Sequence, residues 1–214
     1  MKRLGTTIVL VGVPIIGISL IVALAQSQAN PKPKAITVAG RPLPDCPVGG
    51  QPISFAVQTS SENGPVFFCC PNCIKKFNAE PKKFVDKVTD QRKALAQFPR
   101  TQIICPFSGE AVKSTIFIED KGSKVYFCCQ NCRGKYEKDP AKYAANLANS
   151  YTYQNNCPVT GKPIAPQISA TAPAGETVFF CSKDCPDKFH KDPRQFAPKL
   201  EEQGFRLDLT KKAP

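Results

Sequence analysis

The sequence has no tryptophan, one histidine (His190) and one methionine, the initiator Met1. These counts exclude a His-rich zinc scavenger and a Met-rich copper scavenger. The 214 residues include 21 prolines, which argues against one long helical bundle. With one histidine there is no Ser–His–Asp set, and the chain has neither a Gly-rich phosphate loop nor a paired-carboxylate signature. We therefore expect a protein that is not an enzyme.

The N-terminus has the pattern of a targeting segment. Lys2 and Arg3 precede 18 residues, Ile8 to Ala25, that carry no charge. This run is longer than most signal-peptide cores and shorter than most spanning helices. Residues 1–25 are thus either a signal peptide or a membrane anchor that contacts the membrane through residues 8–25. Both predict an exported, periplasmic or otherwise extracytoplasmic protein, held in the inner membrane if the segment is an anchor. Residues 26–44 read as a Pro-rich, extended linker.

Basic residues outnumber acidic ones by 29 to 17, a net charge of +12. Cleavage after residue 25 would leave 27 against 17, or +10. This charge favours an anionic envelope surface or an acidic protein as a partner. We expect no nucleic-acid partner, because the chain is predicted to lie outside the cytoplasm.

Eleven cysteines fall into three groups with the same spacing, which is typical of an internal repeat. Each group opens with a Cys-Pro-x-x-Gly turn. After 22 or 23 intervening residues a second cysteine ends an aromatic strand, and a third follows after three more residues. The repeats predict unit 1 at 45–90, unit 2 at 104–148 and unit 3 at 156–204. The three-cysteine frameworks are Cys46, Cys69, Cys73; Cys105, Cys128, Cys132; and Cys157, Cys181, Cys185.

Each unit predicts a ββα arrangement, so the fold class is α+β. Hairpin turns are expected at 63–64, 121–122 and 174–175, because glycine favours the backbone conformation of such turns. A helix should follow each aromatic strand, and a proline should start a second helical turn. The strand aromatics are expected in the core; they are Phe67, Phe68, Tyr126, Phe127, Phe179 and Phe180. A unit of about fifty residues usually needs a metal, disulfides or neighbours for stability.

Three thiols from a turn, a strand end and a first helical turn should converge, which suits a soft metal ion. Cys70 and Cys129 offer a fourth thiol in units 1 and 2, where unit 3 has Ser182. His190, five residues after Cys185, is either a substitute ligand or an exposed helix residue. The main alternative is disulfide bonding, because an exported protein matures in an oxidising compartment. The odd count in unit 3 and the adjacent Cys69 and Cys70 fit that alternative poorly.

The segments CPVGGQPI…VFFCCPNCIKKF, CPFSGEAV…VYFCCQNCRGKY and CPVTGKPI…VFFCSKDCPDKF resemble the YHS and TRASH domain family. The resemblance implies small treble-clef-like metal-binding modules and assigns the ligand role to the nine framework cysteines. Many family members have another cysteine in the opening turn, where this chain has Gly49, Ser108 and Thr160. Either Cys70 and Cys129 replace it or the sites are trigonal, which would favour Cu⁺ over Zn²⁺.

The sequence thus predicts a non-enzymatic metal-binding protein that holds zinc structurally or sequesters or relays a soft ion such as copper. The alternative is a disulfide-stabilised basic scaffold that docks to an acidic envelope partner without metal. A third hypothesis is redox exchange through Cys70-x-x-Cys73 and Cys129-x-x-Cys132. No thioredoxin-like βαβ pattern surrounds those two motifs.

Overall fold

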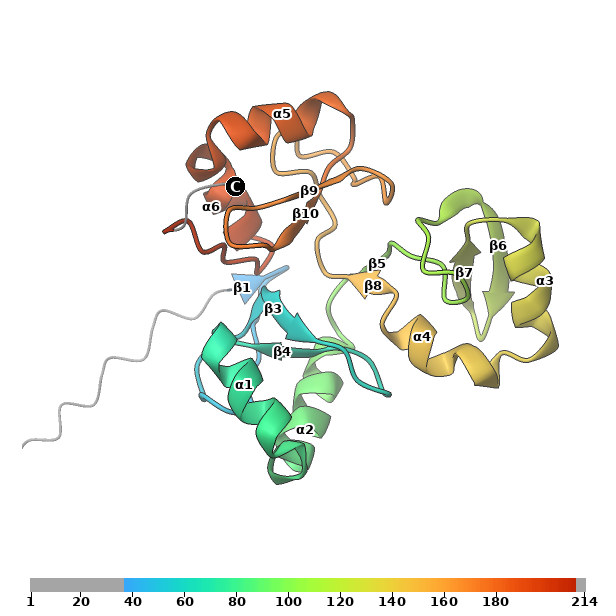
Figure 1. Cartoon of the computed structure of the whole chain (residues 1–214), viewed down its shortest axis with the longest axis horizontal. Helices are drawn as coiled ribbons and strands as arrows, with labels where there is room; N and C mark the ends of the chain where they lie inside the picture. The colour runs from blue at the N-terminus through green and yellow to red at the C-terminus, as the bar shows by residue number, and fades with distance from the viewer. Residues whose placement is uncertain (1–36, 211–214) are drawn as a thin grey trace, which may run out of the picture. The chain divides into compact units, whose positions relative to one another are not determined.

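The structure of the protein is a computed structural model, and it describes residues 37–210. Small antiparallel strand pairs alternate with helices along this part of the chain, which confirms the predicted α+β class (Figure 1). The predicted targeting segment, 1–25, and the first part of the predicted linker lie outside the described residues. Within 37–210, no helix is long and apolar enough to cross a membrane.

The elements follow the order of the sequence. The strands are β1 (Thr37–Val38), β2 (Arg41–Pro42), β3 (Ser54–Thr59), β4 (Val66–Phe68), β5 (Thr101–Gln102), β6 (Lys113–Asp120), β7 (Ser123–Phe127), β8 (Tyr151–Thr152), β9 (Ser169–Thr171) and β10 (Thr177–Phe179). The helices are α1 (Pro71–Ala79), α2 (Val85–Leu95), α3 (Gln130–Lys138), α4 (Ala144–Ala148), α5 (Asp184–Lys191) and α6 (Pro193–Glu201), with 3₁₀ turns at Pro81–Phe84 and Ala141–Tyr143.

Each predicted unit contains an antiparallel strand pair followed by a helix: β3, β4 and α1; β6, β7 and α3; β9, β10 and α5 (Figure 1). The turn between β6 and β7 has positive φ at both Lys121 and Gly122, as a two-residue hairpin turn requires. The first two pairs share one irregularity. The register shifts between Ser54 and Gln58 in β3, and between Lys113 and Phe117 in β6. Both hairpins are therefore bent at the same place by an extra stretch of chain.

Prolines start the second helical turns in two of the three units. Pro81 begins the 3₁₀ turn after α1, and Pro193 begins α6. Asp192 precedes Pro193 and caps α6 by accepting hydrogen bonds from the backbone N–H groups of Arg194 and Gln195. Proline is tolerated there because its missing N–H would lack a partner inside the helix in any case.

The apolar core is continuous between units 1 and 3, whereas unit 2 has a cluster of its own. Phe55 of β3 stacks on Tyr153, with ring centroids 4.4 Å apart, and lies 5.8 Å from the ring of Phe205 beyond α6. Burying aromatic side chains is the largest apolar gain available to domains of this size. Units 1 and 3 thus gain stability from each other as neighbours.

The predicted aromatic core is confirmed except at one position. Phe67, Phe68, Phe127, Phe179 and Phe180 are all buried. Tyr126, which follows Val125 in β7, is only half-buried, and its ring lines an open cavity.

The end of the predicted linker differs from an extended spacer. β1 and β2 pair with each other, and their neighbourhood contributes two buried side chains, Val38 and Leu43, to the shared core. Residues 37–44 therefore belong to the folded part of the chain.

The C-terminal segment is fastened to β3. The backbone N–H of Phe55 donates to the carbonyl of Gly204, and Ser54 exchanges two hydrogen bonds with the backbone of Arg206. Gly204 has a φ of +82°, and a Cβ there would lie 2.7 Å from a ring carbon of Phe55. Both observations require glycine.

We predict that Gly204→Ala lowers the free energy of unfolding by about 1–3 kcal/mol, because it combines left-handed backbone strain with overpacking against Phe55. Gly134→Ala in α3 is the matched control, since a Cβ there meets nothing within 4 Å. That substitution should leave stability unchanged or raise it by up to about 1 kcal/mol. Urea denaturation measures both. Equal effects of the two substitutions would contradict this account of the C-terminal segment.

Candidate metal centres

The framework cysteines come together in three groups, one in each unit. In every group the three Sγ atoms all lie within 4.8 Å of one another. The groups are Cys46, Cys69 and Cys73; Cys105, Cys128 and Cys132; and Cys157, Cys181 and Cys185. The structure thus brings together nine of the twelve predicted ligands in the predicted combinations.

The first thiol of each group lies in a closed turn. In unit 2 the N–H of Cys105 donates to the carbonyl of Glu110, and the carbonyl of Cys105 accepts from the N–H of Gly109. The same two bonds close the turns that begin at Cys46 and Cys157. The last glycine of each turn has positive φ, 76° at Gly109, which explains the Gly in Cys-Pro-x-x-Gly. The turn folds the backbone around a buried sulfur.

In units 2 and 3 this turn favours the thiolate form of its cysteine. Burial raises the pKa of Cys105, but the backbone N–H groups of Cys128, Ser108 and Phe107 outweigh it and lower that pKa to about 7. Burial also raises the pKa of Cys157, but hydrogen bonds from the backbone of Cys181 and from the hydroxyl and backbone of Thr160 outweigh it and lower that pKa to about 7. A metal ligand of this kind must be deprotonated, so the turn prepares one sulfur of the set.

The pKa values of the helix cysteines, and that of Cys69 in unit 1, are shifted in the opposite direction. Burial raises the pKa of Cys132 to about 12, with further contributions from hydrogen bonds to Cys129 and Cys128 and from the charge of Cys105. Burial likewise raises the pKa of Cys69 to about 11. Several thiolates cannot share one partly buried place without a compensating cation. A bound cation would remove this opposition, and the additional thiols would then ionise and release their protons.

The spacing of the sulfurs fits shared ligation, and none of them forms a disulfide. The Sγ atoms of the strand and helix cysteines are 3.6 Å apart in units 1 and 2, and 3.8 Å apart in unit 3. Two thiolates bound to one tetrahedral zinc at about 2.3 Å would lie about 3.8 Å apart. A disulfide bond is about 2.05 Å long. All eleven cysteines are free thiols.

A buried glutamine holds the strand that carries the second thiol of each unit, and sequence reasoning missed it. Gln154 donates to the carbonyl of Phe179 at 2.7 Å and accepts from its N–H at 2.9 Å. Gln102 makes the same pair of bonds with Tyr126, and Gln91 of α2 makes it with Phe67. Each clamped residue lies two positions before the strand cysteine.

A sequence signal for two of these glutamines exists. Gln102 and Gln154 both lie three residues before the turn cysteine, in QIIC and QNNC. Unit 1 has Leu43 at that position. Its clamping glutamine is Gln91 of α2, which comes after the strand in the sequence instead of before it. The amide therefore fixes the distance between the turn and strand cysteines in units 2 and 3.

The fourth-position thiols lie beside the groups. Cys70 and Cys129 precede the first residues of α1 and α3, and their Sγ atoms are 3.6 and 3.5 Å from those of Cys73 and Cys132. The backbone N–H of Cys132 lowers the pKa of Cys129, as expected at a helix N-terminus. Ser182 takes the same place in unit 3, with its Oγ 3.2 Å from Cys185 Sγ. Units 1 and 2 thus have one more thiol at hand than unit 3.

The opening turn distinguishes the sites further. A Cβ on Gly49 would lie 2.8 Å from Cys69 Sγ, so unit 1 has no room for a side chain there. In unit 2 the hydroxyl of Ser108 lies 3.2 Å from Cys128 Sγ, and in unit 3 that of Thr160 lies 3.0 Å from Cys181 Sγ. Each hydroxyl can donate a hydrogen bond to the neighbouring thiolate and so stabilise its negative charge.

His190 points elsewhere in the structure. Its Nε2 lies 3.2 Å from the carbonyl oxygen of Thr171 in β9, and it is exposed on α5. The group in unit 3 consists of cysteines alone. This placement matches the alternative of an exposed helix residue.

No protein-family model, curated protein or solved structure matches the chain. The geometry of the three sulfur groups therefore carries the functional argument.

We predict that Gln154→Leu, which leaves the N–H and carbonyl of Phe179 without partners, lowers the free energy of unfolding by about 2–4 kcal/mol. It should also weaken metal binding in unit 3 more than in unit 2. Gln195→Leu on the exposed side of α6 is the control and should change little. Chemical denaturation and titration with a chromophoric zinc chelator measure the two effects. If Gln154→Leu left the free energy of unfolding unchanged, the glutamine clamp would not contribute to stability as we predict.

Proposed function

We propose that the protein binds soft transition-metal ions, one in each of its three cysteine groups. The observation that carries this proposal is the threefold occurrence of three sulfurs within 4.8 Å of one another, from a turn, a strand end and a helix start. Soft thiolates prefer zinc and Cu⁺ to calcium or magnesium. The raised pKa values of Cys69 and Cys132 support it, because these clusters need a cation before they can ionise fully.

The number of thiols available for ligation differs between the units, so we propose two kinds of site. Cys70 and Cys129 would complete tetrahedral four-thiolate sets in units 1 and 2, which are typical of structural zinc. Unit 3 offers three thiols and the hydroxyls of Thr160 and Ser182, a set better suited to a three-coordinate soft ion such as Cu⁺. In this proposal unit 1 and unit 2 are each stabilised by a zinc ion of their own. Unit 3 sequesters or relays its ion.

The proposal also covers the family of the protein and the compartment in which it binds metal. The chain would be an exported member of the YHS and TRASH group with treble-clef-like modules, directed by the basic start and uncharged run of residues 1–25. It would have no enzymatic activity of its own. Proteins that keep reduced metal-binding thiols outside the cytoplasm retain them by metal ligation, because free thiols there are oxidised.

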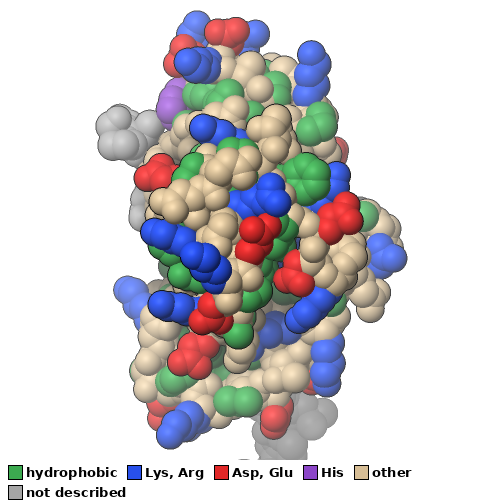
Figure 2. Space-filling model, turned by 90° about the vertical axis from the view of Figure 1, so that its right-hand side faces the viewer, with side chains coloured by type: hydrophobic (Ala, Val, Ile, Leu, Met, Phe, Trp, Pro, Cys, Tyr) green, Lys and Arg blue, Asp and Glu red, His purple; other side chains and the backbone are tan. Residues whose placement is uncertain are grey.

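The alternative of a basic docking scaffold has less support. On the face that Figure 2 shows, lysine and arginine side chains are interspersed with aspartate and glutamate and do not form one basic patch. The disulfides which that alternative requires are absent from residues 37–210. Redox exchange uses two thiols that react with each other. Cys73 and Cys132 instead each lie in a group of three framework thiols.

Native mass spectrometry of the full chain, reduced and loaded with zinc under anaerobic conditions, should count three ions. The double variant Cys105→Ser/Cys132→Ser should bind two, because it leaves unit 2 with only Cys128 and Cys129 and leaves the other groups intact. Ser108→Ala, the neighbouring control, should still bind three, since its hydroxyl supports Cys128 and is not required for ligation. A fully reduced chain that binds no ion, or an unchanged count in the double variant, would contradict the proposal.

A further inference from the structure

A cavity of about 970 Å³ lies away from the three sulfur groups. Its walls come from β5, the start of β6, the start of β7, β8 and the segment 164–167. Cavities of about 300–1,000 Å³ are typical of small-molecule sites. No cysteine lines it, so metal binding does not account for it.

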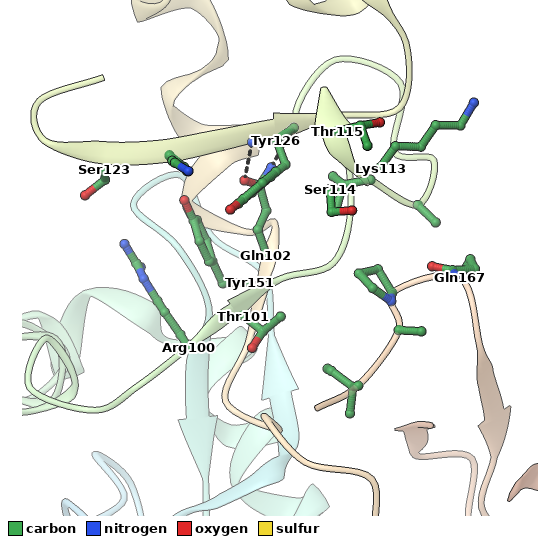
Figure 3. A pocket seen from close by; sticks show the side chains of 16 residues that line it. Arg100, Thr101, Gln102, Lys113, Ser114, Thr115, Ser123, Tyr126, Tyr151 and Gln167 are labelled. Atoms are coloured by element: carbon green, nitrogen blue, oxygen red, sulfur yellow. Dashed lines mark hydrogen bonds between the residues drawn. The ribbon is translucent and has the colours of Figure 1, made fainter. Parts of the chain in front are cut away.

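Three basic residues line this cavity, and Figure 3 shows that the guanidinium of one of them, Arg100, faces the end at which Ser123 lies. Arg100, Lys113 and Lys124 contribute to the walls, and no aspartate or glutamate does. Within residues 37–210, none of the three forms an ion pair with a carboxylate. The ammonium of Lys124 lies over the Phe117 ring, 4.3 Å from its centroid. Arg100 is therefore the cation that can attract an anion to the Ser123 end.

Polar groups converge at one end of the cavity. Figure 3 shows the guanidinium of Arg100 and the hydroxyls of Tyr151 and Tyr126 directed towards the end at which Ser123 lies. The Arg100 guanidinium carbon is 4.1 Å from the centroid of the Tyr151 ring, so the ring holds the cation in place. Neither tyrosine hydroxyl is hydrogen-bonded to another described residue. These donors are arranged for a ligand oxyanion.

Apolar and aromatic side chains line other parts of the cavity. The rings of Tyr126 and Tyr151 form part of one wall, and Val112, Ile164 and Pro166 form others. The backbone of Tyr126 is fixed by the two hydrogen bonds to Gln102 that Figure 3 draws as dashed lines. A rigid aromatic wall next to a group of cationic and hydroxyl donors is complementary to an aromatic ring that bears an acidic group.

We propose that this cavity binds a small aromatic anion, with its carboxylate or phosphate at Arg100, Tyr151 and Ser123 and its ring against Tyr126 and Tyr151. The burial that raises the pKa of Tyr151, against the opposing effect of Arg100, keeps its hydroxyl protonated as a donor at neutral pH. The site is separate from the thiols, so ligand and metal can bind at the same time.

Isothermal titration of the full, reduced, zinc-loaded chain with 2-naphthoate tests the proposal, with 2-naphthalenemethanol as a neutral probe of the same shape. We expect naphthoate to bind about tenfold more tightly than the alcohol, because only the anion makes charge-assisted hydrogen bonds. Arg100→Gln should remove that preference. Tyr151→Leu should weaken both probes, since it removes the ring that both contact.

Lys138→Gln is the matched control, because Lys138 is exposed on α3 and does not line the cavity. It removes the same charge and should leave both affinities unchanged. Equal binding of the two probes, no binding of naphthoate, or an equal loss in Lys138→Gln and Arg100→Gln would overturn the proposal. Zinc counted in the same samples separates the two accounts: a chain that binds three ions but no naphthoate refutes only this cavity site.

Discussion

Three sulfur atoms within 4.8 Å of one another, partly removed from water, impose the main physical constraint on each unit. To bind a metal the sulfurs must all be negative, yet their mutual repulsion and burial oppose that charge. The opposing shifts in unit 2 express the conflict: the pKa of Cys105 is lowered to about 7 and that of Cys132 is raised to about 12. A bound cation resolves it, and the surrounding fold can be understood as the means of holding the sulfurs in place for that cation.

The fold meets this constraint with backbone hydrogen bonds as well as with a core. Each turn cysteine is closed between two backbone bonds, and each strand cysteine follows a residue clamped by a buried glutamine amide. The helix cysteine lies in a first helical turn, where burial raises its pKa, as at Cys132 and Cys185. Packing alone is a weak constraint on the three sulfurs, because small units have little core to pack.

Repeat spacing predicted much of this arrangement. The alignment of the turn, strand and helix cysteines defined the nine sulfurs that the structure brings together, because a fixed spacing within a repeated ββα pattern leaves few other solutions. Glycines such as Gly122 marked the hairpin turns, and prolines such as Pro193 marked helix starts. These signals are local, so the sequence alone was sufficient.

Features that depend on contacts between distant segments were not predictable in the same way. The stacking of Phe55 on Tyr153 and the attachment of Gly204 to β3 join residues about one hundred or more positions apart. Gln102 and Gln154 repeat three residues before a cysteine, but only the structure shows that they bond a strand 24 or 25 residues later. The same holds for Tyr126, whose place in an aromatic strand suggested the core and whose ring in fact lines a cavity.

X-ray absorption spectroscopy of the zinc-loaded chain tests the central claim most directly, because it measures the atoms bound to the metal. Sulfur ligation in all three units predicts a first shell dominated by sulfur at about 2.3 Å, with a minor oxygen or nitrogen contribution from unit 3. A first shell of oxygen and nitrogen at about 2.0–2.1 Å would mean that the ions are bound elsewhere, and it would contradict the account.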